Sequence, residues 1–256
     1  MLICALGDLI LDVIVRLERP LAGGDDTLAT TVLAPGGQAA NVAAWAAELG
    51  ARARLVTKFA DDEPGRLLAT ELERRGIDRA GPTADGRTGV VVSLVDPGGD
   101  RSMASDRGAG AQLRPEELDD GWFECDVLHV SGYALVLAER AAAAARSHGA
   151  RISVDLSAES LVDDVFRDRL QRIAPDVVFA TEREAAAVGG VPGAALVLKR
   201  GPRGLAVDGQ DFPARAVEAV DSTGAGDALA AGFLLGGPEL GLEAAARCVA
   251  QVGAMP

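Results

Sequence analysis

The sequence predicts an α/β protein with a mainly parallel sheet that is covered on both faces by helices. Three observations lead to this prediction. From residue 126 onward, short apolar runs alternate with helical patterns. Glycines such as Gly50 and Gly76 end predicted helices. Two earlier segments, within about 12–34 and 88–105, are β-prone without that alternation, so they predict a small separate sheet such as a lid.

The first half of the chain begins with an apolar run at 2–6 that ends in Gly7-Asp8, as expected for a central strand and its turn. Gly36-Gly37 then opens a long helical pattern. In chain order, the predicted elements are strands 2–6, 13–17 and 27–33, helix 38–49, strand 53–57, helix 64–75 and strand 88–95.

In the second half, short apolar runs typical of strands alternate regularly with helical patterns, as expected for parallel βα units. Its predicted elements are strand 126–130, helix 135–148, strand 152–155, helix 162–173, strand 177–180, helix 182–188, strands 195–199 and 205–207, and helices 225–235 and 242–252. No repeat or clear linker interrupts the chain, so residues 1–256 are expected to form one domain with a lid.

Composition excludes several classes of function. The net charge of −13 disfavours nucleic acid and anionic membranes as partners. No apolar run reaches the about 18–20 residues of a membrane span. Three cysteines without metal-type spacing predict neither a disulfide framework nor a zinc site, and a reducing cytoplasm is the expected location. The apolar N-terminus carries Asp8 and Asp12 without a basic leader, which indicates a buried strand.

The sharpest chemical signal is the segment from Asp221 to Ala228, with the sequence DSTGAGDA, followed by a helical run. Gly224 and Gly226 allow consecutive amides to point one way at a helix start, where the macrodipole favours an anion. Such a nest can hold charge that develops during phosphoryl or acyl transfer. Asp227 follows it directly and is placed to accept a hydroxyl proton. The alternative is a helix cap with glycines for packing.

Other nucleotide motifs are incomplete or missing. Gly224 and Gly226 form the start of a dinucleotide fingerprint, but Leu229 stands where its third glycine belongs. The chain has no GxxxxGK[ST] motif, which excludes a Walker-type site. His129, in an apolar strand, and His148, near a helix end, are isolated, so neither is expected to be catalytic.

A second signal lies in the N-terminal third. Gly36-Gly37 before a helix permits close approach of a ligand to the backbone, and Asn41 offers a donor and an acceptor one turn later. Asn is unfavourable in a helix interior, so its presence needs a reason. Ligand binding and helix capping are the two alternatives. Asp8 and Asp12 follow the first strand, where carboxylates suit hydroxyl recognition, although Asp8 also fits a solvated turn.

Together these residues resemble the ribokinase-like (PfkB) family of carbohydrate and nucleoside kinases over nearly the whole chain. The resembling segments are, in order, Gly7-Asp8 with Asp12, Gly36-Gly37 with Asn41, Asp61 to Gly65, Arg107 to Ala109, Lys199 to Gly204, and Asp221 to Asp227. The last is the most specific. Two departures stand out: Thr181 replaces the Asn of the family's Asn-x-x-Glu motif while Glu184 keeps its carboxylate, and the chain stops at Pro256.

The resemblance implies a three-layer α/β/α fold with a β-sheet lid, ATP as phosphoryl donor with Mg²⁺, and a sugar or nucleoside as acceptor. It implies Asp227 as base with Gly224, Ala225 and Gly226 as anion hole, and a possible homodimer through the lid. The other implied roles are acceptor binding by Asp12, Gly36, Gly37, Asn41 and Arg107, nucleotide binding by Thr181, Lys199, Gly201, Gly204 and Gly226, a water-mediated Mg²⁺ contact by Glu184, and a monovalent cation such as K⁺ beside Asp221 and Thr223. A non-catalytic binding module on the same fold is the alternative.

Overall fold

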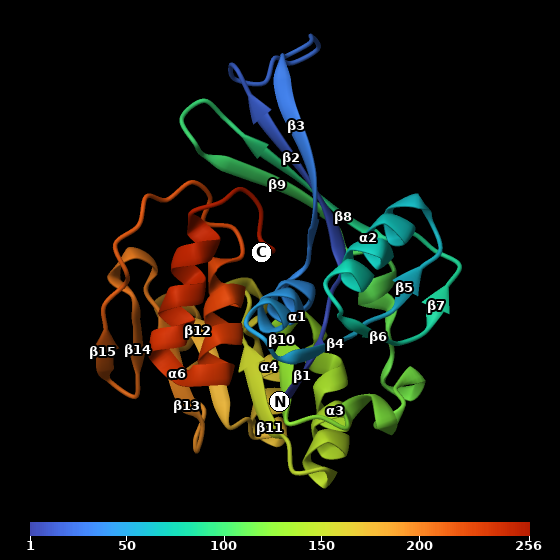
Figure 1. Ribbon diagram of the computed structural model, residues 1–256, viewed down its shortest axis with the longest axis vertical. Coiled ribbons are helices and arrows are strands. Elements are labelled where there is room, and N and C mark those ends of the chain that lie inside the picture. Colours follow the sequence, from blue (N-terminus) through green and yellow to red (C-terminus); the bar gives the residue numbers. More distant parts are fainter.

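The computed structural model describes residues 1–256, and a large twisted sheet forms its centre (Figure 1). The strand order is β15-β14-β13-β12-β11-β10-β1-β4-β6, with β14 and β15 antiparallel at one edge and the other neighbours parallel. The strands are β1 (Leu2–Leu6), β4 (Arg52–Val56), β6 (Asp78–Ala80), β10 (Val127–Ser131), β11 (Arg151–Asp155), β12 (Val177–Thr181), β13 (Ala195–Lys199), β14 (Leu205–Val207) and β15 (Gln210–Phe212).

Helices cover both faces of this sheet, which is why its central strands are apolar at consecutive positions. Along β1, Ile3 packs into one core with α1 and α6, whereas Cys4 packs into a second core with α3 and α4. The helices are α1 (Gln38–Glu48), α2 (Glu63–Arg74), α3 (Leu135–Ser147), α4 (Asp164–Ile173), α5 (Glu182–Val188) and α6 (Ala225–Val249). None of them has the length and apolar character needed to cross a membrane.

A second sheet of four strands, here called the lid, projects from the body of the molecule (Figure 1). Its order is β3-β2-β8-β9, from β2 (Ile10–Leu17), β3 (Ala29–Gly36), β8 (Gly89–Val95) and β9 (Arg101–Asp106). The two central strands, β2 and β8, are parallel, so the lid joins two segments that are far apart in sequence. A short pair, β5 (Phe59–Ala60) with β7 (Thr83–Ala84), lies apart from both sheets.

The α/β class and the separate small sheet are confirmed. The differences lie at element ends and in four short strands that were not predicted, β5, β6, β7 and β15. The strand predicted at 27–33 runs over Ala29–Gly36, because an edge strand tolerates Pro35. The two predicted C-terminal helices are both present as the two parts of α6, which non-helical Gly236 and Gly237 separate before Pro238; the second part ends at Val249 rather than at Val252. Glycine and proline therefore break the helix, and the chain folds back at the break, because a Cβ on Gly241 would lie only 2.9 Å from the carbonyl oxygen of Leu229.

Candidate active site

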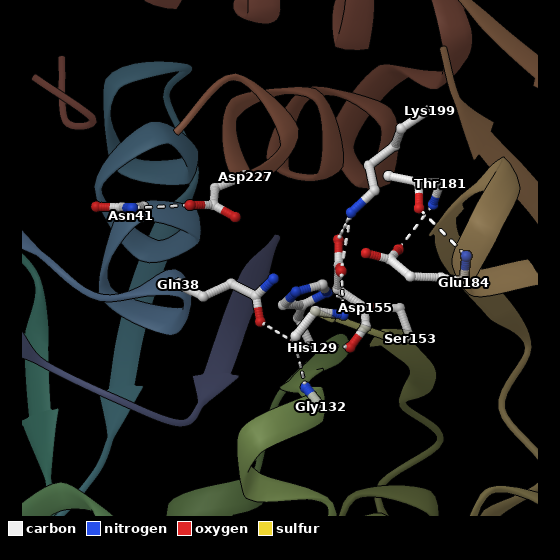
Figure 2. A network of polar contacts seen from close by, with 11 residues as sticks. Gln38, Asn41, His129, Gly132, Ser153, Asp155, Thr181, Glu184, Lys199 and Asp227 are labelled. Carbon is white, nitrogen blue, oxygen red and sulfur yellow. Dashed lines mark hydrogen bonds and ion pairs between the residues drawn. The ribbon is translucent and has the colours of Figure 1, made fainter. Parts of the chain in front are cut away.

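The candidate active site lies at the carboxyl edge of the large sheet, where open α/β sheets bind their ligands. Strands β11 and β13 end there at Asp155 and Lys199, and α1 and α6 begin there. Figure 2 shows Asp227, Lys199, Asp155 and Gln38 directed toward a common space between these elements. Residues from both halves of the chain therefore share one site.

Asp227 lies in the first turn of α6. The N-cap residue Gly224 has a φ of 78°, and a Cβ there would lie 2.6 Å from the Cβ of Ala254, so only glycine fits. The amides of Asp227 and Ala228 donate to the Gly224 carbonyl, whereas the amide of Gly226 has no acceptor within the chain. This helix start thus presents a free N–H beside a carboxylate.

Asn41 holds the Asp227 carboxylate from α1. Its Nδ2 donates to Asp227 Oδ2 at 2.7 Å (Figure 2). Burial raises the pKa of Asp227 to about 8, although the hydrogen bond from Asn41 opposes that shift. The Oδ1 atom of Asn41 is buried without a partner, so it is free to accept a hydrogen bond from a ligand.

The double glycine makes room for two carboxylates. A Cβ on Gly36 would lie 2.2 Å from Asp12 Oδ2, and one on Gly37 would lie 2.6 Å from the carbonyl oxygen of Asp8. Burial raises the pKa of Asp12 to about 6, and the nearby carboxylates of Asp8 and Asp221 add to the shift. The predicted acceptor-binding residues Asp12, Gly36, Gly37 and Asn41 are therefore clustered.

Arg107 enters the same region from the end of the lid. Its Nη1 lies 3.0 Å from Asp8 Oδ2, and its guanidinium stacks 3.8 Å from the ring centroid of Tyr133. Asp8 is buried, and it also accepts a long hydrogen bond of 3.4 Å from the Ala39 amide. Arg107 is thus already paired, and it orders Asp8 next to Asp12.

Lys199 approaches the first turn of α6 from the opposite side. Its Nζ lies 2.9 and 2.6 Å from the two carboxylate oxygens of Asp155, whose side chain is only 1% exposed. Burial alone would lower the pKa of Lys199, but the Asp155 carboxylate outweighs it, so the pKa is raised. A Cβ on Gly226 would come within 3.7 Å of Nζ, so the ammonium group lies beside the free Gly226 amide.

Thr181 and Glu184 form a capping box at the start of α5. The Glu184 amide donates to Thr181 Oγ1 at 3.3 Å, and the Thr181 amide donates to Glu184 Oε2 at 2.7 Å (Figure 2). The second oxygen of Glu184 takes no part in this box. Gly201 opens a short 3-10 helix at the surface, and Gly204 has a φ of 91° with no room for a Cβ beside Phe212.

Asp221 and Thr223 do not present a free cation site. The Asp221 carboxylate, 1% exposed, accepts from Arg101 Nη2 at 2.7 Å. Arg101 also contacts Thr223 Oγ1. Burial would raise the pKa of Asp221, but the hydrogen bond from Arg101 and those from Thr223 and Gly253 lower it to about 2. A lid arginine therefore stands where the resemblance implied a monovalent ion.

Sequence reasoning missed several residues of this site. Asp155 was assigned only to a strand, although a carboxylate at the carboxyl end of a buried parallel strand was a usable signal. The Ser157 hydroxyl bridges Gln38 Oε1 at 2.5 Å and the Gly132 amide at 2.8 Å. No local pattern marks Ser157 or Gln38, because the residues that they contact are distant in sequence. His129 is buried against Ser153, as a structural residue would be, and burial lowers its pKa to about 4.

A parallel sheet with a β-sheet lid and a buried carboxylate beside a free amide fits a phosphotransferase that acts on small molecules. The model of the pfkB family of carbohydrate kinases matches residues 1–255. The chain therefore belongs to the pfkB family of carbohydrate kinases.

Individual relatives support this assignment. The chain is 32% identical to an ATP-dependent ribose-1-phosphate kinase of Halopiger xanaduensis, over 93% of this chain and 86% of that protein. It is 31% identical to a cytidine kinase of Thermococcus kodakarensis, over 80% and 81% of the two chains. The crystal structure of adenosine kinase from Sinorhizobium meliloti superposes with a TM-score of 0.87 at 27% identity, over 100% of this chain and 95% of that one.

Proposed function

We propose that this protein transfers the γ-phosphoryl group of ATP to a hydroxyl of a sugar or nucleoside, with Asp227 as general base. The observation that carries the proposal is the pairing of Asp227 with Asn41 at a helix start where the Gly226 amide is free. An ATP-coupled assay with a panel of sugars, sugar phosphates and nucleosides tests it. Turnover with none of them would favour a non-catalytic binding module.

In this mechanism the acceptor hydroxyl gives its proton to the Asp227 carboxylate as its oxygen bonds to the γ-phosphorus. The bond from that phosphorus to the bridging oxygen breaks, and ADP leaves. Negative charge that develops on the phosphoryl oxygens is stabilised by the backbone from Gly224 to Gly226 and by the Lys199 ammonium. Asn41 keeps the carboxylate oriented for the proton transfer.

The acceptor is proposed to bind between Asp12, the Gly36-Gly37 backbone and the free Oδ1 of Asn41. Asp12→Asn is expected to raise the acceptor KM by about 10- to 100-fold, because a hydrogen bond to a charged group is worth roughly 1.5–3 kcal/mol. The KM for ATP should change little. Steady-state kinetics with each substrate varied in turn check this.

The matched control for Asp12→Asn is Asp106→Asn. Asp106 belongs to the same lid, but its side chain is 55% exposed and pairs with Arg87 at 3.4 Å. An acceptor KM that rises equally in both variants would mean that the lid charge matters in general, and the placement of the acceptor at Asp12 would be wrong.

Mg²⁺ would reach this site with the phosphates of ATP and most of its water shell, where it neutralises phosphate charge. The chain has no cluster of three His, Cys, Asp or Glu side chains that could hold the ion alone. Glu184 fits an outer contact through water, because its second oxygen is outside the capping box. Thr181, Lys199, Gly201 and Gly204 stay our proposed nucleotide contacts.

Glu184→Gln is expected to raise the half-saturating Mg²⁺ concentration several-fold. Gln preserves a capping box, so the substitution removes the charge and keeps the helix start. The control is Glu182→Gln in the same turn, where the carboxylate pairs with exposed Arg203. A Mg²⁺ titration of the rate decides: equal curves for the parent and Glu184→Gln would limit Glu184 to helix capping.

Two further expectations stay predictions. Residues 1–256 are proposed to act as one kinase domain whose lid covers the acceptor. A homodimer through the lid is a prediction that fits the exposed apolar side chains on its edge strands, Leu33 on β3 and Met103 on β9.

A further inference from the structure

The lid touches the catalytic segment through Arg101, the first residue of β9. Arg101 pairs in the sheet with Val95, so it lies at the base of the turn that joins β8 to β9. Figure 1 shows this hairpin extending from the lid toward the loop that precedes α6. The guanidinium contacts both Asp221 and Thr223, which lie 120 and 122 residues away in sequence.

Asp221 needs a cation in this position because its carboxylate is almost fully buried. A buried carboxylate is costly unless it is paired and hydrogen-bonded. Its Oδ1 also accepts from the Thr223 amide at 2.9 Å, and its Oδ2 accepts from the Gly253 amide at 3.3 Å. The carboxylate thus organises the backbone just before Gly224, and Arg101 supplies the compensating positive charge.

We propose that Arg101 is a built-in cation of the phosphoryl site: it takes the place of the monovalent ion and fastens the closed lid to the anion-hole segment. Arg101 is a positioning residue, since it acts through Asp221 and Thr223 on the backbone that receives the phosphoryl charge. Closing the lid completes the anion hole, and a lid held away leaves Asp221 unpaired. The inference rests on the proposed phosphoryl transfer.

Cation dependence gives the first test. The parent enzyme should show less than a twofold difference in kcat between K⁺, Na⁺ and tetramethylammonium at constant ionic strength. Arg101→Ala should lower kcat at least tenfold in tetramethylammonium, and K⁺ should restore part of the loss by occupying the vacated position. The kcat of Arg101→Lys should lie between those of the parent and Arg101→Ala, because Lys keeps the positive charge but lacks the two-pronged geometry of the guanidinium group.

The matched control is Arg87→Ala. Arg87 lies beside the lid and pairs with Asp106, but its side chain is 84% exposed. This variant should behave like the parent in every salt. Strong K⁺ activation of the parent would overturn the replacement of the ion by Arg101. Unchanged kcat in Arg101→Ala would overturn the coupling of the lid to the anion hole.

Hydrogen exchange gives a second test that needs no turnover. Amides of residues 221–226 and of the hairpin at 95–101 should exchange at least fivefold faster in Arg101→Ala than in the parent or Arg87→Ala. K⁺ should slow exchange at 221–226 in Arg101→Ala and leave the hairpin fast. Equal exchange in all three proteins would refute the proposal that Arg101 fastens the lid to the anion-hole segment, even if the kinase activity is confirmed. Faster exchange in Arg101→Ala, with no activity of the parent on any acceptor, would support the role of Arg101 in holding the lid and would contradict only the proposed function.

Discussion

Asp227→Asn is expected to lower kcat by about 10²- to 10⁴-fold, the usual cost of removing a general base. The Asn side chain is isosteric and can still accept the hydrogen bond from Asn41 Nδ2, so the geometry of the helix start should be preserved. Only the ability to take the hydroxyl proton is lost. Rapid-quench or coupled assays of ADP formation with the best acceptor measure the effect. Retention of more than about a tenth of the parent kcat would remove Asp227 from the role of base.

The same substitution should make the protein more stable at alkaline pH. The pKa of Asp227 in the folded protein is about 8, well above its ordinary value of 3.8, so folding favours the protonated form. The parent therefore loses stability as the pH rises from about 4 to about 8, and the neutral variant does not. Each pKa unit corresponds to about 1.4 kcal/mol, so a gain of a few kcal/mol is expected at pH 8 and almost none near pH 4. Urea unfolding at both pH values checks the sign, and it also shows that lost activity is not lost fold.

The second large effect is the pH dependence of the reaction. Since the base must be ionised, the rate with both substrates far below their KM values should fall tenfold per pH unit below about 8. With an unperturbed Asp as base, this acidic limb of the pH profile, where the rate falls, would lie near pH 4. Below about pH 6 the slope should steepen, because Asp12 is then protonated as well. Between pH 8 and pH 6 alone, the expected loss is about 50-fold, because half of the Asp227 carboxyl is ionised at pH 8 and about one part in a hundred at pH 6.

Two measurements separate these groups. Asp12→Asn should remove the steepening below pH 6 and keep the limb near 8. Carboxyl ¹³C titration of the free protein, with the Asp227 signal assigned by its absence in Asp227→Asn, reports the pKa without any contribution from the phosphates of ATP. A carboxyl that titrates below about 5 would show that burial does not raise the pKa of Asp227 as the geometry indicates.

Much of the fold follows from local pattern. The apolar runs of the parallel strands, the glycines that end α1 and α2, and the change of period after residue 126 each depend on neighbours within a few residues. The helix start at Gly224 to Asp227 is also local, because glycine conformation and the first-turn carboxylate are encoded side by side. The errors of the prediction are accordingly shifts at element ends and the omission of the shortest strands, β5, β6, β7 and β15, which span only two or three residues each.

The assembled site depends on contacts that no local pattern encodes. Asn41 and Asp227 are 186 residues apart, and Lys199 and Asp155 are 44 apart. The order of strands in the sheet and the packing of α1 with α6 bring them to one edge. The pKa of Asp227 likewise results from burial beneath α1 and the neighbouring charges, not from its motif.

The sequence by itself determined the fold class and the family, and it is the source of the proposal that residues 224–227 are the chemical centre, because these signals reside in short contiguous segments. The tertiary structure alone decided that Arg101 of the lid lies on the buried carboxylate of Asp221. It also decided that Thr181 caps α5 and that Arg107 is paired with Asp8. The physical reason is the same in each case: a charge or hydroxyl takes its role from the partner that burial forces on it, and that partner is chosen by the packing of distant segments.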